Sequence, residues 1–118
     1  MVEQTPQDMI KAVRDAIATY GVEFMMEVID IYLADAPRRL VDLRQAYASC
    51  NGEAFTRAAH TLKSSSAYVG AKHFSDLAKA VELASRQGAV ADLGDQVTRL
   101  EAAYVQVKAA LEEVRNGR

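Results

Sequence analysis

The chain has 118 residues, of which 50% are hydrophobic and 25% charged, proportions typical of one soluble globular domain. Its 14 basic and 16 acidic residues leave a net charge of −2, so no strong field marks it as a nucleic-acid or membrane-surface binder. The length excludes an ATP-binding kinase, a TIM barrel and a dinucleotide-binding enzyme of ordinary size. We therefore expect a single domain over residues 1–118, with neither nucleic acid nor a membrane as partner.

Cysteine content and the N-terminal sequence bear on the cellular compartment. Cys50 is the only cysteine, so no intrachain disulfide can form, and a reducing compartment fits best. The sequence has no apolar run of about 18 residues that would predict a spanning helix. The first residues have neither the basic start nor the apolar stretch of a secretory signal. We expect a cytoplasmic protein.

Helical spacing begins near residue 6 and continues through most of the chain. Residues 6–19 carry apolar side chains from Met9 to Ile17 on one face, which predicts a short amphipathic helix. A second apolar stripe runs over residues 22–49 in steps of three and four and keeps its phase through Pro37. Because proline removes one backbone donor, we expect a kink there rather than a break.

Three further helical segments follow the second. Residues 53–69 and 71–87 are predicted to form two helices joined at Gly70, a natural place for a left-handed residue after a helix end. Residues 90–115 carry apolar residues at alternating steps of four and three, a seam for packing along neighbouring helices. No segment alternates with period two, so strands are not expected. The predicted fold is all-α: an antiparallel, up-down four-helix bundle with a short extra N-terminal helix.

Basic charge is concentrated on the predicted hairpin of residues 53–87. Residues 57–86 carry five basic and two acidic side chains, a local charge of +3, whereas residues 1–56 carry −4. A solvated helix surface would by itself account for such an excess. His60 lies in the middle of the excess, off the apolar stripe of its helix, and Lys63 is one helical turn away.

Two features near His60 distinguish it from an ordinary surface histidine. Residues 64–66 are three serines, poor helix formers that keep the helix surface low and leave room for a partner. Glu82 comes about as far after the predicted turn as His60 comes before it, so the two can face one another across the hairpin. A carboxylate bonded to one ring nitrogen fixes the tautomer and leaves the other nitrogen free. An unused histidine and a chance surface glutamate remain the alternatives.

An exposed, oriented imidazole beside lysines can be a general base, a metal ligand or a nucleophile toward phosphorus. A general base needs a concave substrate site, which a small packed bundle does not obviously offer. A metal site needs more ligands, and His73 and Cys50 are not level with His60, so no metal is expected. Serine–lysine chemistry usually needs Ser-x-x-Lys, whereas Lys63 precedes the serines here.

The run Ala58–Ser66 (AAHTLKSSS), Gly70 ten residues after His60, and Glu82 in the next helix resemble the histidine-containing phosphotransfer (HPt) domains of bacterial and fungal phosphorelays. The resemblance implies a phosphoryl carrier without ATP-dependent kinase activity of its own. It would relay a phosphoryl group between aspartates of receiver domains in a hybrid histidine kinase and a response regulator. The resemblance also implies a monomer that binds no cofactor, because the partner receiver domain supplies Mg²⁺.

The same resemblance implies a role for each matching residue. His60 would be the phosphoacceptor, Lys63 would place positive charge near the phosphoryl oxygens, and Glu82 would orient the ring. Gly70 would form the structural turn. The remaining positions of the phosphoryl or partner surface are two small residues, a tyrosine bulkier than we would expect near such a site, and a basic residue: Ser64, Ala67, Tyr68 and Arg86.

Apolar residues of the second helix are further candidates for the partner surface. These are Phe24, Met25 and Met26, although Met25 is expected to pack in the core. A partner's helix would lie against such apolar and small residues around the histidine.

Two other functions are compatible with the pattern. A non-catalytic helical interaction bundle that regulates a signalling partner would keep the motif without the chemistry. The dimerisation and phosphoacceptor domain of a histidine kinase usually has an acidic residue directly after the histidine and a proline a few residues on. Here Thr61 follows His60, and no proline occurs after Pro37. Acid-labile phosphorylation would distinguish a phosphotransfer protein from the interaction bundle. Oligomeric state would distinguish it from the kinase domain, because kinase domains of that kind dimerise.

Overall fold

The computed structural model describes residues 4–117, most of which lie in helices joined by short connections. No strand occurs within residues 4–117, so the all-α prediction is confirmed. The elements in chain order are α1 (Pro6–Tyr20), α2 (Val22–Ala48), α3 (Gly52–Tyr68), α4 (Lys72–Arg86), the short 3-10 helix η1 (Val90–Asp92) and α5 (Gly94–Asn116).

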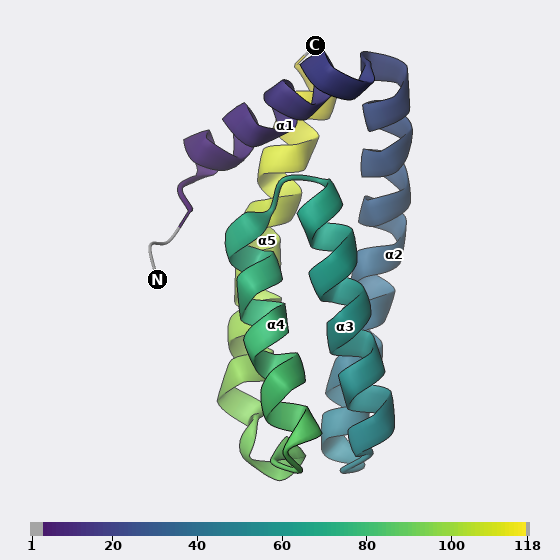
Figure 1. Ribbon diagram of the computed structural model, residues 1–118, viewed down its shortest axis with the longest axis vertical. Helices are drawn as coiled ribbons and strands as arrows, with labels where there is room; N and C mark the ends of the chain where they lie inside the picture. The colour runs from purple at the N-terminus through teal and green to yellow at the C-terminus, as the bar shows by residue number, and fades with distance from the viewer. Residues whose placement is uncertain (1–3, 118) are drawn as a thin grey trace.

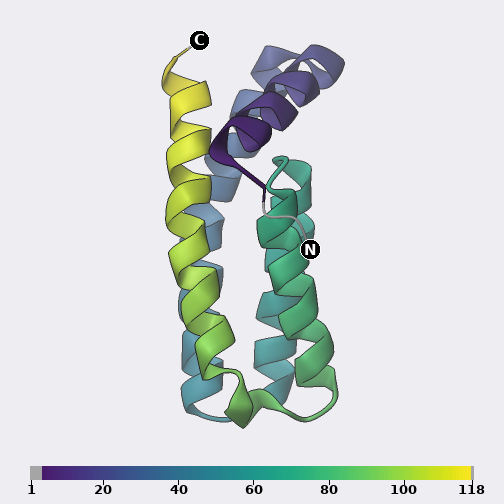
Figure 2. The same cartoon turned by 90° about the vertical axis from the view of Figure 1, so that its left-hand side faces the viewer.

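Helices α2 to α5 lie along the long axis of the molecule (Figure 1). Helices α3, α4 and α5 each run in the opposite direction to the α-helix before them, so α3 and α4 form a hairpin. Helix α3 packs on α2 and α4, and α5 packs on the same two helices. Helix α1 lies across one end of the molecule, where it contacts α5 and α2 (Figure 2).

Local sequence accounts for the start of α1 and the continuity of α2. The Thr5 hydroxyl accepts a hydrogen bond from the Asp8 amide at 3.0 Å, and the Asp8 carboxylate accepts one from the Thr5 amide at 3.2 Å. This reciprocal capping satisfies two amides that the first turn leaves without helical partners. Helix α2 contains Pro37 and is uninterrupted, so the chain does not break at the proline, as predicted.

The last helix starts later than the sequence predicts. The expected helix over residues 90–115 is divided into η1 and α5, and α5 begins only at Gly94. A Cβ at Gly94 would lie 2.5 Å from the hydroxyl oxygen of Tyr47, too close for any real side chain. The chain therefore passes tightly under the Tyr47 ring at this point, a contact between distant segments that helical periodicity does not reveal.

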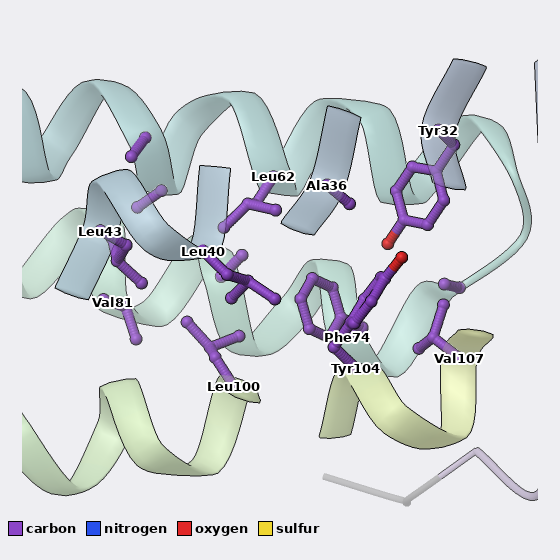
Figure 3. Close-up of a cluster of buried hydrophobic side chains, with 14 of the residues drawn as sticks. Tyr32, Ala36, Leu40, Leu43, Leu62, Phe74, Val81, Leu100, Tyr104 and Val107 are labelled. Carbon is purple, nitrogen blue, oxygen red and sulfur yellow. The ribbon is translucent and has the colours of Figure 1, made fainter. Parts of the chain in front are cut away.

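The apolar faces of the long helices meet in one core. The ring centroid of Tyr104 lies 6.1 Å from that of Phe74 and 6.2 Å from that of Tyr32 (Figure 3). The Tyr32 hydroxyl lies 2.8 Å from Oγ of Ser66, and both residues are buried. Ser66 occupies the core, where the phenol of Tyr32 gives its hydroxyl a partner. Burial raises the pKa of Tyr32 well above its usual value, which keeps the phenol neutral.

Gly70 turns the chain from α3 into α4. Its φ of 81° lies in the left-handed region, as the sequence predicts, and a Cβ there would lie 3.2 Å from Cβ of Ala12. The Gly70 carbonyl accepts a hydrogen bond from the Gln4 side chain at 3.0 Å. This short turn makes α3 and α4 antiparallel neighbours and sets the register in which His60 meets Glu82.

Candidate functional site

His60 projects from the middle of α3 beside Glu82 of α4. Nδ1 of His60 lies 2.9 Å from Oε2 of Glu82. The imidazole is 54% exposed, whereas the carboxylate is only 5% exposed. Because an ionised carboxylate can only accept, the proton is assigned to Nδ1 and the lone pair to Nε2. The structure thus brings together the two residues that the hairpin register predicts to face one another.

Glu82 also binds two cations. Nζ of Lys63 lies 3.1 Å from Oε1, and Nη2 of Arg86 lies 2.7 Å from Oε2. Burial alone would raise the pKa of Glu82, but the hydrogen bonds from Arg86, Lys63 and His60 outweigh it and lower that pKa to about 2. One ionised, buried carboxylate therefore organises three side chains of the site.

The sequence predicts this arrangement only in part. The family resemblance implies that Lys63 lies near the phosphoryl oxygens, whereas the structure places its Nζ on the Glu82 carboxylate. The spacing of four residues between Glu82 and Arg86 was the available signal for their ion pair. The burial of Glu82 had no such signal, since a charged residue off the apolar stripe is usually exposed.

Hydroxyl groups tie α3 to α4 on both sides of this cluster. Oγ of Ser75 donates to the Lys63 carbonyl at 2.7 Å on the side toward the turn. On the other side, Oγ1 of Thr56 lies 2.7 Å from Oγ of Ser85. Short side chains let the two helices approach closely, and the hydrogen bonds fix their relative height. The sequence does not predict these contacts, because serines and threonines in a helix pattern give no sign of long-range partners.

The small and aromatic residues that follow His60 border an apolar groove. Ala67 and Tyr68 are exposed and line it, and the Tyr68 side chain has the greatest exposure of the large hydrophobic residues, at 77%. The groove has a volume of about 690 Å³ and lies between α1, α2 and α3. Ser64 is half-buried and lies outside the residues that line the groove. Arg86 belongs instead to the cluster around Glu82.

The apolar candidates of α2 separate in the structure. Phe24 is exposed and lines the groove. Ile31, two helical turns further along α2, is also exposed and lines it. Met25 is buried, as expected, and Met26 is half-buried. Phe24 is therefore the one of the three that presents an apolar surface to a partner.

Metal binding, membrane insertion and the second histidine also bear on the function of the described chain. Within residues 4–117, no three His, Cys, Asp or Glu side chains come together as metal ligands would. None of the helices in the described chain is both long and apolar enough to cross a membrane. His73 is half-buried at the start of α4, and its Nδ1 has no hydrogen-bond partner among the described groups.

An exposed imidazole oriented by a buried carboxylate, on an all-α domain, is the arrangement of a helical phosphotransfer domain. The model of the Hpt domain family matches residues 27–117, which span most of α2 and all of α3, α4 and α5. The chain therefore belongs to the Hpt domain family, whose members are phosphoryl carriers of two-component phosphorelays rather than kinases. No curated protein and no solved structure matches the chain.

Proposed function

We propose that this protein relays a phosphoryl group between aspartates of receiver domains, in a hybrid histidine kinase and a response regulator, through a phosphohistidine at His60. The observation that carries the proposal is the 2.9 Å contact between Nδ1 of His60 and Glu82, which leaves Nε2 free on an exposed helix face. We also infer that residues 1–118 act as one monomeric domain, an antiparallel up-down four-helix bundle of α2–α5 to which α1 is added.

The proposed reaction needs one nucleophile from this chain. The lone pair on Nε2 of His60 attacks the phosphorus of a receiver's aspartyl phosphate, so that an N–P bond forms as the P–O bond breaks. The aspartate leaves with the electron pair of that bond. The ring becomes positively charged in the process, and the Glu82 carboxylate stabilises that charge through Nδ1–H. Phosphoryl transfer depends mainly on positioning and charge stabilisation, for which the receiver would supply Mg²⁺.

Lys63 is expected to act on this reaction through charge. Lys63→Ala removes a cation that lies 3.1 Å from Glu82 and one helical turn from His60. The developing negative charge on the phosphoryl oxygens loses part of its stabilisation, so the rate of transfer from a phosphorylated receiver should fall about tenfold. Lys79→Ala removes an exposed lysine of α4 outside the cluster and should leave the rate unchanged. Equal transfer rates for Lys63→Ala and Lys79→Ala would show that Lys63 pairs with Glu82 but does not contribute to phosphoryl transfer.

The apolar groove beside His60 is the surface on which we expect a receiver domain to dock. It exposes Tyr68, which follows the histidine on α3, and Ile31 of α2. Tyr68→Ser should weaken binding of an unphosphorylated receiver about tenfold, because exposed aromatic side chains contribute strongly to interfaces. Val105→Ser is the control, since Val105 is a similarly exposed apolar residue of α5 that does not line the groove. Titration calorimetry would measure the affinity of each variant for the receiver. Equal affinities would mean that the receiver does not dock on the apolar groove.

The proposed function is tested by phosphoryl transfer from a panel of phosphorylated receiver domains in the presence of Mg²⁺. Acid-labile, alkali-stable label on His60 is the expected result. A folded, monomeric protein that takes no label from any receiver would instead be an interaction bundle that has kept the motif without the chemistry.

A further inference from the structure

A second hollow lies on the N-terminal side of His60 along α3. It has a volume of about 590 Å³, is open to solvent and is lined by both helices of the hairpin. Side chains of a helix lean toward its N-terminus, so the imidazole of His60 leans over this hollow rather than toward the apolar groove. The residues lining it are Gly52, Glu53, Thr56, Arg57 and His60 of α3 with Ser85 and Arg86 of α4.

The hydroxyl groups that line the hollow have no hydrogen to offer a ligand. Oγ1 of Thr56 lies 2.8 Å from the Gly52 carbonyl and 2.7 Å from Oγ of Ser85. Oγ of Ser85 in turn lies 2.7 Å from the Glu82 carbonyl. The two hydroxyl groups have one hydrogen each, and together they make three contacts within the protein. Neither hydrogen is left over for a ligand. The side-chain donors left for an anion in the hollow are therefore the cationic groups at its edge.

Arg57 and Arg86, the two arginines at this edge, form ion pairs that differ in burial. Arg86 donates to the buried Glu82 carboxylate at 2.7 Å. Within residues 4–117, the ion pair of Arg57 is with Glu53, one turn earlier in α3, at 3.0 Å. Both side chains of that pair are largely exposed, at 67% and 86%. An exposed pair of this kind contributes little to stability, so Arg57 can exchange Glu53 for another anion at small cost.

We propose that this hollow receives the oxygens of the phosphoryl group on His60, and that Arg57 is a phosphoryl-binding residue for which Glu53 is the resting partner. Arg57 lies one turn before His60, and Lys63 lies one turn after it, so cations flank the ring along α3. The planar guanidinium can donate two parallel hydrogen bonds to phosphoryl oxygens. This assignment rests on the proposed function, because it concerns the phosphorylated state of His60.

The test is a pair of charge variants with opposite expected effects. Phosphorylated protein is titrated by ³¹P NMR, and the pKa of the phosphoryl group on His60 is read from the shift. Arg57→Gln should raise that pKa by about half a unit, because the dianion loses a cation. Glu53→Gln should lower it by a comparable amount, because Arg57 is released and a nearby anion is removed. Arg14→Gln, an exposed arginine of α1, is the control and should leave the pKa unchanged.

A second measurement keeps this assignment separate from the proposed function. Inorganic phosphate is titrated into the unphosphorylated protein, and binding is followed through amide shifts of α3. Arg57→Gln should weaken binding about threefold and Glu53→Gln should strengthen it. Suppose that His60 takes label, and that Arg57→Gln and Arg14→Gln have the same phosphoryl pKa and the same affinity for phosphate. That result would overturn the assignment of Arg57 and leave the proposed function intact. If wild type takes no label, the proposed function fails, and equal phosphate affinities of the two arginine variants would then reject the hollow as an anion site as well.

Discussion

His60→Gln is expected to reduce phosphoryl acceptance at least a hundredfold while leaving the fold intact. An amide nitrogen is not a nucleophile toward phosphorus, so the variant lacks the group that would form the N–P bond. The fold should survive because the imidazole is 54% exposed and contributes little to the core. The amide of glutamine can also donate to the buried Glu82 carboxylate, so that group keeps a partner. Transfer of label from a phosphorylated receiver measures the loss.

The other histidine supplies the matched control for this variant. His73 lies at the start of α4, is half-buried, and lies outside the cluster around Glu82. His73→Gln should therefore accept label at the wild-type rate. Label that persists in His60→Gln and disappears in His73→Gln would move the phosphoacceptor to α4. Circular dichroism of both variants would establish that each is folded.

Replacement of Glu82 is expected to have the largest effect on stability. In Glu82→Gln, Lys63 and Arg86 lose the buried anion that they share. The pKa of Glu82 is lowered from 4.5 to about 2, and each unit corresponds to about 1.4 kcal/mol. The free energy of unfolding at pH 7 should fall by about 3 kcal/mol. Phosphoryl transfer should slow as well, by a smaller factor than in His60→Gln, because ring orientation is lost and the nucleophile remains.

The effect of Glu82→Gln should depend on pH with a definite sign. The pKa of Glu82 is lower in the folded protein, so the ionised carboxylate stabilises the fold fully above about pH 4.5 and loses its effect as the pH falls toward 2. The difference in unfolding free energy between wild type and variant should therefore narrow over that interval. Urea denaturation at a series of pH values measures it. Glu53→Gln removes a largely exposed carboxylate and should change stability by no more than about 0.5 kcal/mol. A difference that is constant from pH 7 to 2.5 would contradict a role for the Glu82 charge.

The helices and the meeting of His60 with Glu82 could be predicted from the sequence, because both depend on local spacing. Apolar residues at steps of three and four indicate which face of each helix is buried. A short turn at Gly70 then makes the register of α3 against α4 a matter of counting residues from that turn. The prediction succeeded for this pair because the hairpin is formed by adjacent segments of the chain.

Features that depend on distant segments could not be predicted in this way. The late start of α5 coincides with the close approach of Gly94 to Tyr47 of α2. The burial of Ser66 on α3 accompanies the contact of its hydroxyl with that of Tyr32 on α2. Each is a long-range packing outcome that the spacing of residues along one segment does not contain.

The exposure of a single ring nitrogen on a convex helix has a consequence for how a signal would pass through the protein. Donor and acceptor receivers would both need Nε2 of His60, so the two could not occupy it together. Each must leave before the other arrives, which gives a double-displacement scheme in which the carrier alternates between loaded and empty forms. An excess of unloaded acceptor would then occupy empty carriers and delay their reloading. The throughput of such a relay would be highest at an intermediate abundance of its recipient, so expression levels would tune the response as much as binding strengths do.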